Sequence, residues 1–181
     1  MVPFTDKYSR KCKWTTLKNF SQISFFFATV ILSGCALFGG GSESLQRAKG
    51  YQVIAPKEWV AKNTESESDQ AFQTPSGNIA TITSSCKRNT NVSLEVLTRH
   101  LLLGARHIVT EKKELYKTSA GEGLYSSVKA TLDGVEFHLE LFVLSKNSCI
   151  FDFSLVSPKK ISVLEKESFV TFFKSLTYGT N

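Results

Sequence analysis

The sequence predicts an α+β fold, in which an antiparallel sheet of about six to seven strands carries two packed helices. Three patterns predict this fold class. Apolar and polar residues alternate on both sides of Asp133-Gly134, a strong signal for a two-residue hairpin turn. Leucines recur with helical spacing over residues 94–101, and a mainly aromatic set does so over residues 169–176.

The first half of the predicted domain contains short strands followed by a helix. The strands are expected at residues 51–54, from Trp59 onward, at 71–74 and at 79–85. Pro75-Ser76-Gly77-Asn78 is a turn signal between the last two of these strands. Ser93 is a good N-cap for the helix, and Gly104 is placed to end it.

A central meander follows, with a strand at 107–116, a loop at 121–123 and the hairpin at Asp133-Gly134. A two-residue turn puts Leu132 opposite Val135 and, further along, Val128 opposite Leu139. On the other face it puts Ser127 opposite Glu140. The register therefore gathers apolar residues on one face and polar residues on the other.

The last strand carries the apolar set Cys149, Phe151, Phe153 and Leu155. Bringing this set onto the face of Phe137 requires a loop of odd length, so we expect Ser145-Lys146-Asn147 with a left-handed Asn147. The closing helix is expected to start near Ser157-Pro158 and to lay its aromatic face on the sheet.

The order of these elements resembles the PsbP-like α/β sandwich. The resemblance spans residues 49–178 of the single domain predicted at 49–181. Its carriers are Tyr51-x-x-x-x-Pro56-x-x-Trp59, the central meander and the closing aromatic helix. Members of that superfamily are mostly binding or assembly factors of unrelated roles, so the fold alone does not fix a function.

The N-terminal segment has the pattern of a secretory signal. The first 18 residues are polar and cationic, and the apolar run at residues 23–32 is too short to cross a bilayer core of about 30 Å. The following Leu32-Ser33-Gly34-Cys35 resembles the lipobox of bacterial lipoproteins. The alternative is a buried core cysteine in an N-terminal hydrophobic helix.

The lipobox resemblance implies a signal peptide at residues 1–34, cleavage between Gly34 and Cys35, and lipid on the Cys35 thiol. Residues 35–48 would then form the lipidated cysteine and a flexible tether, because three successive glycines at 39–41 disfavour regular structure. Ala36 resembles the outer-membrane default of such proteins, facing the periplasm.

The formal net charge of +6 comes mostly from this leader. The first 34 residues hold five of the 22 basic residues and one of the 16 acidic residues, which leaves a net charge of +2. A nearly neutral body has little electrostatic attraction for phosphate backbones, so a nucleic-acid partner is not expected.

Cys86 and Cys149 are the cysteines that remain beside the anchor. Export would take them to a compartment where disulfides persist, and both fall on the apolar parity of their strands. We expect a disulfide between them; two buried free thiols are the alternative. No Cys-x-x-Cys or histidine cluster accompanies them, so no metal or cofactor is expected.

Four side chains are candidates for a chemical role: His138, His100, His107 and Asp152. His138, with Glu136 and Glu140, could bind a metal or act as an acid or base, but Lys129 opposite His138 favours a solvated polar face. His100 and His107 are expected to be ordinary surface or half-buried residues. Asp152 faces away from its apolar neighbours, and one carboxylate alone specifies no reaction.

These patterns favour a membrane-anchored envelope lipoprotein with a non-catalytic binding or assembly-accessory domain and a protein partner in the envelope. Tyr51, Trp59 and Tyr125 are aromatic candidates for its binding surface, although core packing suits Trp59 better. The alternative is a small periplasmic hydrolase using His138 or His100. It requires a pocket that holds a histidine within hydrogen-bond reach of a carboxylate.

Overall fold

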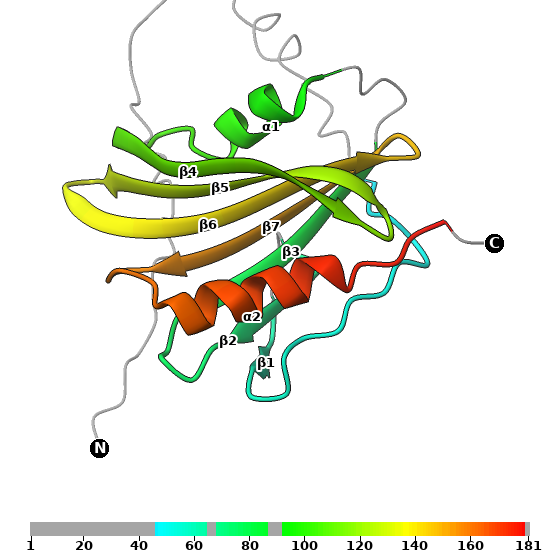
Figure 1. The fold of residues 1–181 in the computed structure, drawn as a ribbon, viewed down its shortest axis with the longest axis horizontal. Coiled ribbons are helices and arrows are strands. Elements are labelled where there is room, and N and C mark those ends of the chain that lie inside the picture. The colour runs from blue at the N-terminus through cyan, green and yellow to red at the C-terminus, as the bar shows by residue number, and fades with distance from the viewer. Residues whose placement is uncertain (1–45, 65–67, 87–91, 180–181) are drawn as a thin grey trace, which may run out of the picture. The chain divides into compact units, whose positions relative to one another are not determined.

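The computed structural model describes residues 46–64, 68–86 and 92–179 (Figure 1). Gly34 and Cys35, and with them the predicted signal peptide, lie outside the described residues. The strands are β1 Val60–Lys62, β2 Gln70–Gln73, β3 Ile79–Cys86, β4 Arg106–Thr118, β5 Gly121–Leu132, β6 Val135–Lys146 and β7 Cys149–Ser157. The helices are α1 Leu94–His100 and α2 Val163–Lys174.

The seven strands form one antiparallel sheet in the order β1-β2-β3-β7-β6-β5-β4. Helix α1 packs against β5 and β6, whereas α2 packs against β4 and β6. The two helices cover opposite faces, because Leu139 and Leu141 of β6 join the apolar cluster beside α1, while Phe142 and Leu144 join the cluster of α2. The predicted α+β class is therefore confirmed (Figure 1).

The β5–β6 hairpin has the predicted turn and register. Asp133 and Gly134 both have positive φ, at 49° and 82°, as a two-residue type I′ turn requires. Leu132 pairs with Val135, and Lys129 pairs with His138. The turn and the alternation of the flanking residues agree, which is why local sequence was sufficient here.

The β6–β7 connection differs from the prediction. It is a two-residue turn, Asn147-Ser148, with positive φ at both positions, and Lys146 pairs with Cys149. Phe153 consequently pairs with Phe142 and shares the α2 face, so the expected odd-length loop and the placement with Phe137 are wrong. Because both faces of the sheet are covered, the second half of β6 carries apolar residues on both faces. Its sequence therefore does not show which register it takes with β7.

Two other segments depart from the predicted strands and loops. Residues 51–54 form no strand, and Gln52 makes an isolated bridge with Thr177 near the chain's C-terminal end. Gly121–Gly123 is not a loop but the start of β5, because the tight turn lies just before it at Ser119-Ala120.

The closing helix begins later than expected, at Val163 instead of near Ser157-Pro158. Ser162 is its N-cap and accepts a hydrogen bond from the Glu165 backbone N–H at 3.2 Å. The Ser162 hydroxyl also donates to the Glu165 carboxylate at 3.2 Å. The expected aromatic face is confirmed: Phe169, Phe172, Phe173 and Leu176 are fully buried.

Gly123 leaves the space that one of these core rings needs. A Cβ added at Gly123 would lie 2.3 Å from Cζ of Phe142 and 2.7 Å from the Val143 carbonyl oxygen. The Phe142 ring itself stacks on Phe173 with centroids 4.0 Å apart. The close approach of the β5 backbone therefore depends on the absence of a side chain.

We expect Gly123→Ala to lower the free energy of unfolding by about 2–3 kcal/mol, the range for overpacking a dense core. Urea denaturation measures the loss. In a Phe142→Leu background the same change should cost less, because the smaller side chain vacates the contact. Equal costs in both backgrounds would contradict the explanation that the Phe142 ring sets the cost.

The two edge strands of the sheet differ in length and regularity. Strand β1 has three residues, whereas β4 has thirteen. The register of β4 against β5 shifts between Arg106 and Val109 and again between Thr110 and Lys112. His107 lies within the first irregularity and has a φ of 50°. These shifts have the character of β-bulges, which bend and twist a strand locally.

Candidate functional site

The two cysteines lie at one end of the sheet, where both ends of the described domain meet. Cys86 and Cys149 are paired in the β3–β7 register and joined by a disulfide. The Cys86 N–H donates to the Gln46 carbonyl at 2.7 Å, and the Tyr178 hydroxyl lies 3.3 Å from Sγ of Cys149. The structure therefore shows the disulfide and not the alternative of two free thiols.

Residues 46–48 pack on the sheet, although the tether was expected to run to residue 48. The Arg47 guanidinium lies 3.3 Å from the Asp69 carboxylate and donates to the Ser84 carbonyl. The Ala48 N–H donates to the Ser84 hydroxyl at 2.9 Å. Asp69 also accepts a hydrogen bond from Tyr51, which places this predicted surface aromatic in a structural contact. The domain thus begins earlier in the chain than expected.

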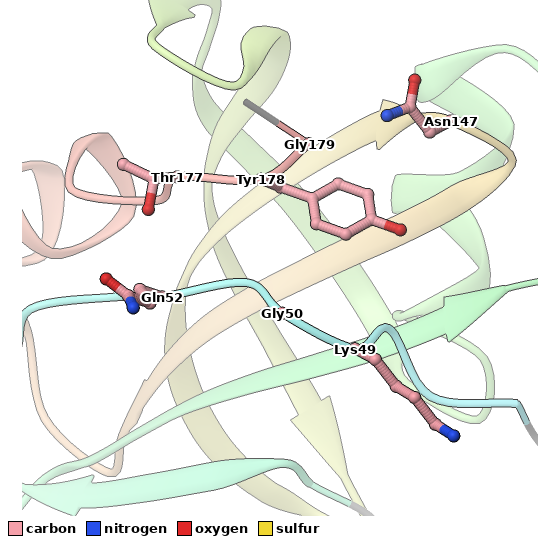
Figure 2. Close-up of a pocket in the computed structure, with 7 residues that line it drawn as sticks. All are labelled: Lys49, Gly50, Gln52, Asn147, Thr177, Tyr178 and Gly179. Atoms are coloured by element: carbon pink, nitrogen blue, oxygen red, sulfur yellow. The ribbon is translucent and has the colours of Figure 1, made fainter. Parts of the chain in front are cut away.

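A cavity of about 410 Å³ lies at the same end. Its lining is Lys49, Gly50, Gln52, Asn147, Thr177, Tyr178 and Gly179. In Figure 2 the Lys49 ammonium group points away from the Tyr178 ring. Lysine and tyrosine are the ionisable residue types in this lining, and they do not converge, so the cavity presents no recognisable reaction centre.

His138 has the polar neighbours that were predicted for it, but its side chain is 13% exposed and therefore not on a fully solvated face. The Lys129 ammonium group lies 2.9 Å from the Glu136 carboxylate, which is the expected cross-strand pairing. His138 Nε2 is 3.9 Å from Glu136, too long for a hydrogen bond. His100 and His107 are exposed. Within residues 46–64, 68–86 and 92–179, no group of three or more His, Cys, Asp or Glu side chains could hold a metal ion.

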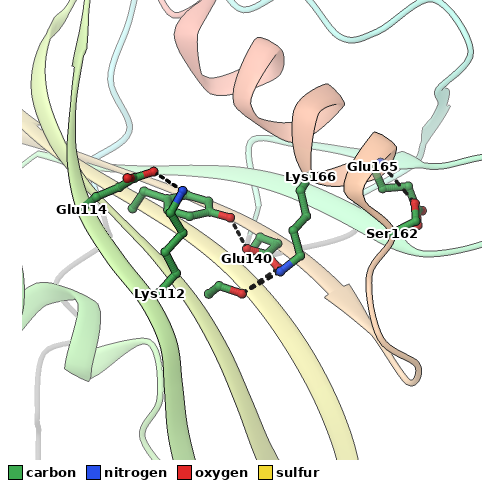
Figure 3. Close-up of polar contacts among 8 residues, drawn as sticks. Lys112, Glu114, Glu140, Ser162, Glu165 and Lys166 are labelled. Atoms are coloured by element: carbon green, nitrogen blue, oxygen red, sulfur yellow. Dashed lines mark hydrogen bonds and ion pairs between the residues drawn. The ribbon is translucent and has the colours of Figure 1, made fainter.

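Glu140 is buried, so the prediction of a solvated face is wrong for this residue. It accepts hydrogen bonds from the Tyr125 hydroxyl and, at 3.0 Å, from Ser127. The ammonium group of Lys166, on α2, lies 2.7 Å from the carboxylate (Figure 3). Sequence reasoning missed this cluster because Lys166 reaches Glu140 only once α2 lies on that face.

Tyr125 belongs to this cluster and is buried, so it is not part of a binding surface. Its side chain is 3% exposed, and burial together with the hydrogen bond to Glu140 raises its pKa far above the ordinary value. The hydroxyl therefore stays protonated and donates its hydrogen bond to Glu140. Trp59 is also buried and packs against Phe172, the core role that suited it better.

Asp152 lies on the opposite face of the sheet, in a cavity of about 240 Å³ beside α1. The cavity is lined by Thr81, Thr83, Leu101, Leu139, Leu141, Asp152, Ser154 and Val156. Oδ1 of Asp152 exposes less than 1 Å² to solvent and has no hydrogen-bond partner among the described residues. Burial raises the pKa of this carboxyl to about 6.

We expect Asp152→Asn to stabilise the protein at pH 7.5 by about 3 kcal/mol, because the pKa rises from 3.8 to about 6 and each pKa unit corresponds to about 1.4 kcal/mol. The folded pKa of about 6 lies above the ordinary value of 3.8, so folding favours the protonated form. The protonated Asp152 carboxyl contributes its full stability below pH 3.8, and this contribution is lost as the pH rises through 6. Thermal unfolding at pH 3.5 and pH 7.5 checks this, and an equal effect at both pH values would contradict it.

No histidine lines these two cavities or a third one, of about 340 Å³, between α1 and strands β4 and β5. That third cavity contains Glu95, Arg99 and Lys113 among its lining residues. The hydrolase hypothesis required a histidine and a carboxylate in one pocket. None of these three cavities has that arrangement.

Comparison with known proteins identifies the fold. No model of a known family and no curated protein matches this sequence. Cyanobacterial PsbP (CyanoP) from Synechocystis sp. PCC 6803 is similar in structure, with a TM-score of 0.53 and 17% identity over 77% of this chain and 95% of that chain. A Pseudomonas aeruginosa protein of unknown function, described as a putative regulator, has a TM-score of 0.50 and 6% identity over 76% of this chain and 89% of its own.

A Bacteroides thetaiotaomicron protein has a TM-score of 0.49 and 17% identity over 72% of this chain. The match covers 45% of that protein, so this chain spans less than half of its length. At these identities the comparisons are informative about the fold alone. The domain has a PsbP-like α+β fold, as the sequence pattern predicted.

Proposed function

We propose that this chain is an exported lipoprotein whose α+β domain acts as a non-catalytic binding or assembly-accessory module in the cell envelope. Cleavage between Gly34 and Cys35 leaves the cysteine at the new N-terminus, and lipid on Cys35 anchors the domain to the outer membrane, facing the periplasm. The observation that carries this proposal is the string Leu32-Ser33-Gly34-Cys35 after a cationic start and a short apolar run.

The disulfide supports the exported location. A bond between Cys86 and Cys149 persists in an oxidising compartment such as the periplasm and is rare in a reducing cytosol. The described residues include no helix of the length and apolar character needed to span a membrane. Lipid chains on Cys35 would supply the attachment, since two or more acyl chains hold a protein stably.

The arrangement of the polar residues supports a binding role. His138 is too far from Glu136 for a hydrogen bond, and Glu140 is committed to a buried network with Tyr125 and Lys166. Neither group is positioned as a general acid or base. The proposed partner is a protein of the envelope.

The anchor is tested by replacing Cys35 with alanine. In a Gram-negative host grown with a radioactive fatty acid, the natural chain should be labelled and should sediment with membranes. Cys35→Ala should lose essentially all label, because the acyl acceptor is gone. Cys12→Ala is the matched control, since it removes a leader cysteine outside the lipobox and should keep the label.

Full labelling of Cys35→Ala would refute the anchor. Mass spectrometry of the natural chain provides a second measurement. A mature protein that starts at an acylated Cys35 supports the proposal, whereas retention of residues 1–34 contradicts it.

A further inference from the structure

The carboxylate of Asp152 is the polar group in this domain whose burial is least explained by its neighbours. Buried polar atoms in folded proteins almost always have a hydrogen-bond partner. Oδ1 of Asp152 has none among the described residues, and no ion pair compensates its charge there. The carboxylates of Glu140 on β6 and Glu165 on α2, by contrast, have such partners. An uncompensated group of this kind calls for a functional explanation.

Asp152 lies near the middle of the sheet, where three strands support it. It pairs with Thr83 of β3 and with Val143 of β6, so its backbone position is fixed on both sides. Its carboxylate shares the face of the sheet that α1 covers in part. A short helix of seven residues leaves the cavity beside Leu101 open on this face.

The walls of the cavity are mainly apolar, with hydroxyl groups that bond to each other. Thr81 and Ser154 have their hydroxyl oxygens 2.8 Å apart, so these two side chains satisfy one another. Leu101, Leu139 and Val156 supply apolar surface. Asp152 is the one ionisable residue among the described residues that line the cavity. The Asp152 carboxylate is therefore the charged group that a ligand in this cavity would meet.

We propose that this cavity binds a primary ammonium group carried on a short alkyl chain. The ammonium donates hydrogen bonds to Asp152 and compensates its charge, while the chain lies against the leucine and valine side chains. The volume of about 240 Å³ is below that of sites for drug-sized ligands, so it suits a chain of roughly four to six carbons. This inference rests on the proposed binding function and specifies its ligand chemistry.

Binding of a cation to Asp152 must depend on pH. The charged form is the one that attracts an ammonium group, and this carboxyl has a pKa of about 6. No other group lining the cavity from β3, β6, β7 or α1 ionises, and Glu140 of β6 lies on the opposite face. The affinity for the ammonium group should therefore fall about ten-fold between pH 7.5 and pH 5, because the charged fraction of the Asp152 carboxyl falls by that factor.

The test is a titration of the full chain, held in a neutral detergent, with n-butylammonium. We follow the amide resonances of Val143 and Ser154 by nuclear magnetic resonance and expect a roughly millimolar dissociation constant, typical of so small a ligand. Butan-1-ol and butyrate have nearly the same shape with no charge or the opposite charge. Both should bind at least ten-fold more weakly.

Asp152→Asn should lose the preference for the ammonium, because the amide keeps the shape and removes the charge. Glu136→Gln is the matched control, since Glu136 is exposed and lies outside the cavity, and it should bind as the natural chain does. Equal binding of butan-1-ol and butylammonium, or unchanged binding by Asp152→Asn, would overturn the proposal.

A second titration identifies the source of the ammonium group, with acetyl-Gly-Lys-Gly-amide as a probe that presents the same group on a peptide. Binding as tight as that of butylammonium points to a lysine of a partner protein. Ten-fold weaker binding points to a free amine. Failure of the anchor is distinguishable from failure of this proposal, because the titration in detergent does not require lipid on Cys35. Conversely, loss of labelling in Cys35→Ala says nothing about Asp152.

Discussion

Replacing Glu140 with alanine should lower the free energy of unfolding by about 3–5 kcal/mol, the cost of removing one partner from a buried ion pair. Glu140 is 1% exposed and accepts from Tyr125, Ser127 and Lys166. Its removal leaves the Lys166 ammonium with Ser127 as a neutral partner and leaves the Tyr125 hydroxyl without its acceptor. Urea denaturation at pH 7.5 measures the effect.

Glu136→Ala is the matched control for this prediction. Glu136 lies on the same strand and also pairs with a lysine, Lys129, but its side chain is 53% exposed. An exposed ion pair contributes about 0–1 kcal/mol, so this variant should remain near the natural stability. A loss below about 1 kcal/mol for Glu140→Ala would show that the buried network contributes little.

Losing the disulfide should destabilise the protein by about 4 kcal/mol, since the bond closes a loop with a sequence separation of 63 residues. Closing a loop of this length restricts the unfolded chain far more than the folded one. A loss of this size is a large share of the 5–15 kcal/mol that stabilises a typical domain, as an order of magnitude. Denaturation of the Cys86→Ser/Cys149→Ser variant measures it.

Dithiothreitol supplies the control for the disulfide. The reductant should destabilise the natural chain by a similar amount and should leave the double variant unchanged, because Cys12 and Cys35 are the same in both proteins. If the reductant shifted the double variant as well, the effect would arise from another cysteine. Equal stability of the natural chain with and without the reductant would refute the prediction.

The elements that the sequence predicted correctly are those with a complete local signal. The hairpin at Asp133-Gly134 combines a turn dipeptide with matching alternation, and both conditions are met within a few residues. The aromatic face of α2 is similar, because its spacing needs no knowledge of the partner surface. The shared parity of Cys86 and Cys149 likewise allowed a disulfide to be predicted.

The incorrect predictions depend on contacts between distant elements. The β6–β7 register could not be inferred, since Leu141 to Leu144 are all buried and give no alternation. Glu140 was expected in solvent because its partner Lys166 arrives from a helix that lies later in the chain. Asp152 was correctly placed opposite its apolar neighbours, but its cavity is made by residues of β3, β6, β7 and the end of α1.

The edges of the sheet affect how copies of the domain can associate. Unpaired edge strands can let neighbouring copies join into larger sheets, and the proposed lipid anchor would make such encounters frequent. Strand β1 offers three residues for such pairing, and the bulges of β4 interrupt the straight run of backbone groups that a second strand would need. Lysines 112 and 113 add charge to that edge. Both edges therefore disfavour edge-to-edge polymerisation, as the crowding imposed by the proposed anchor would require.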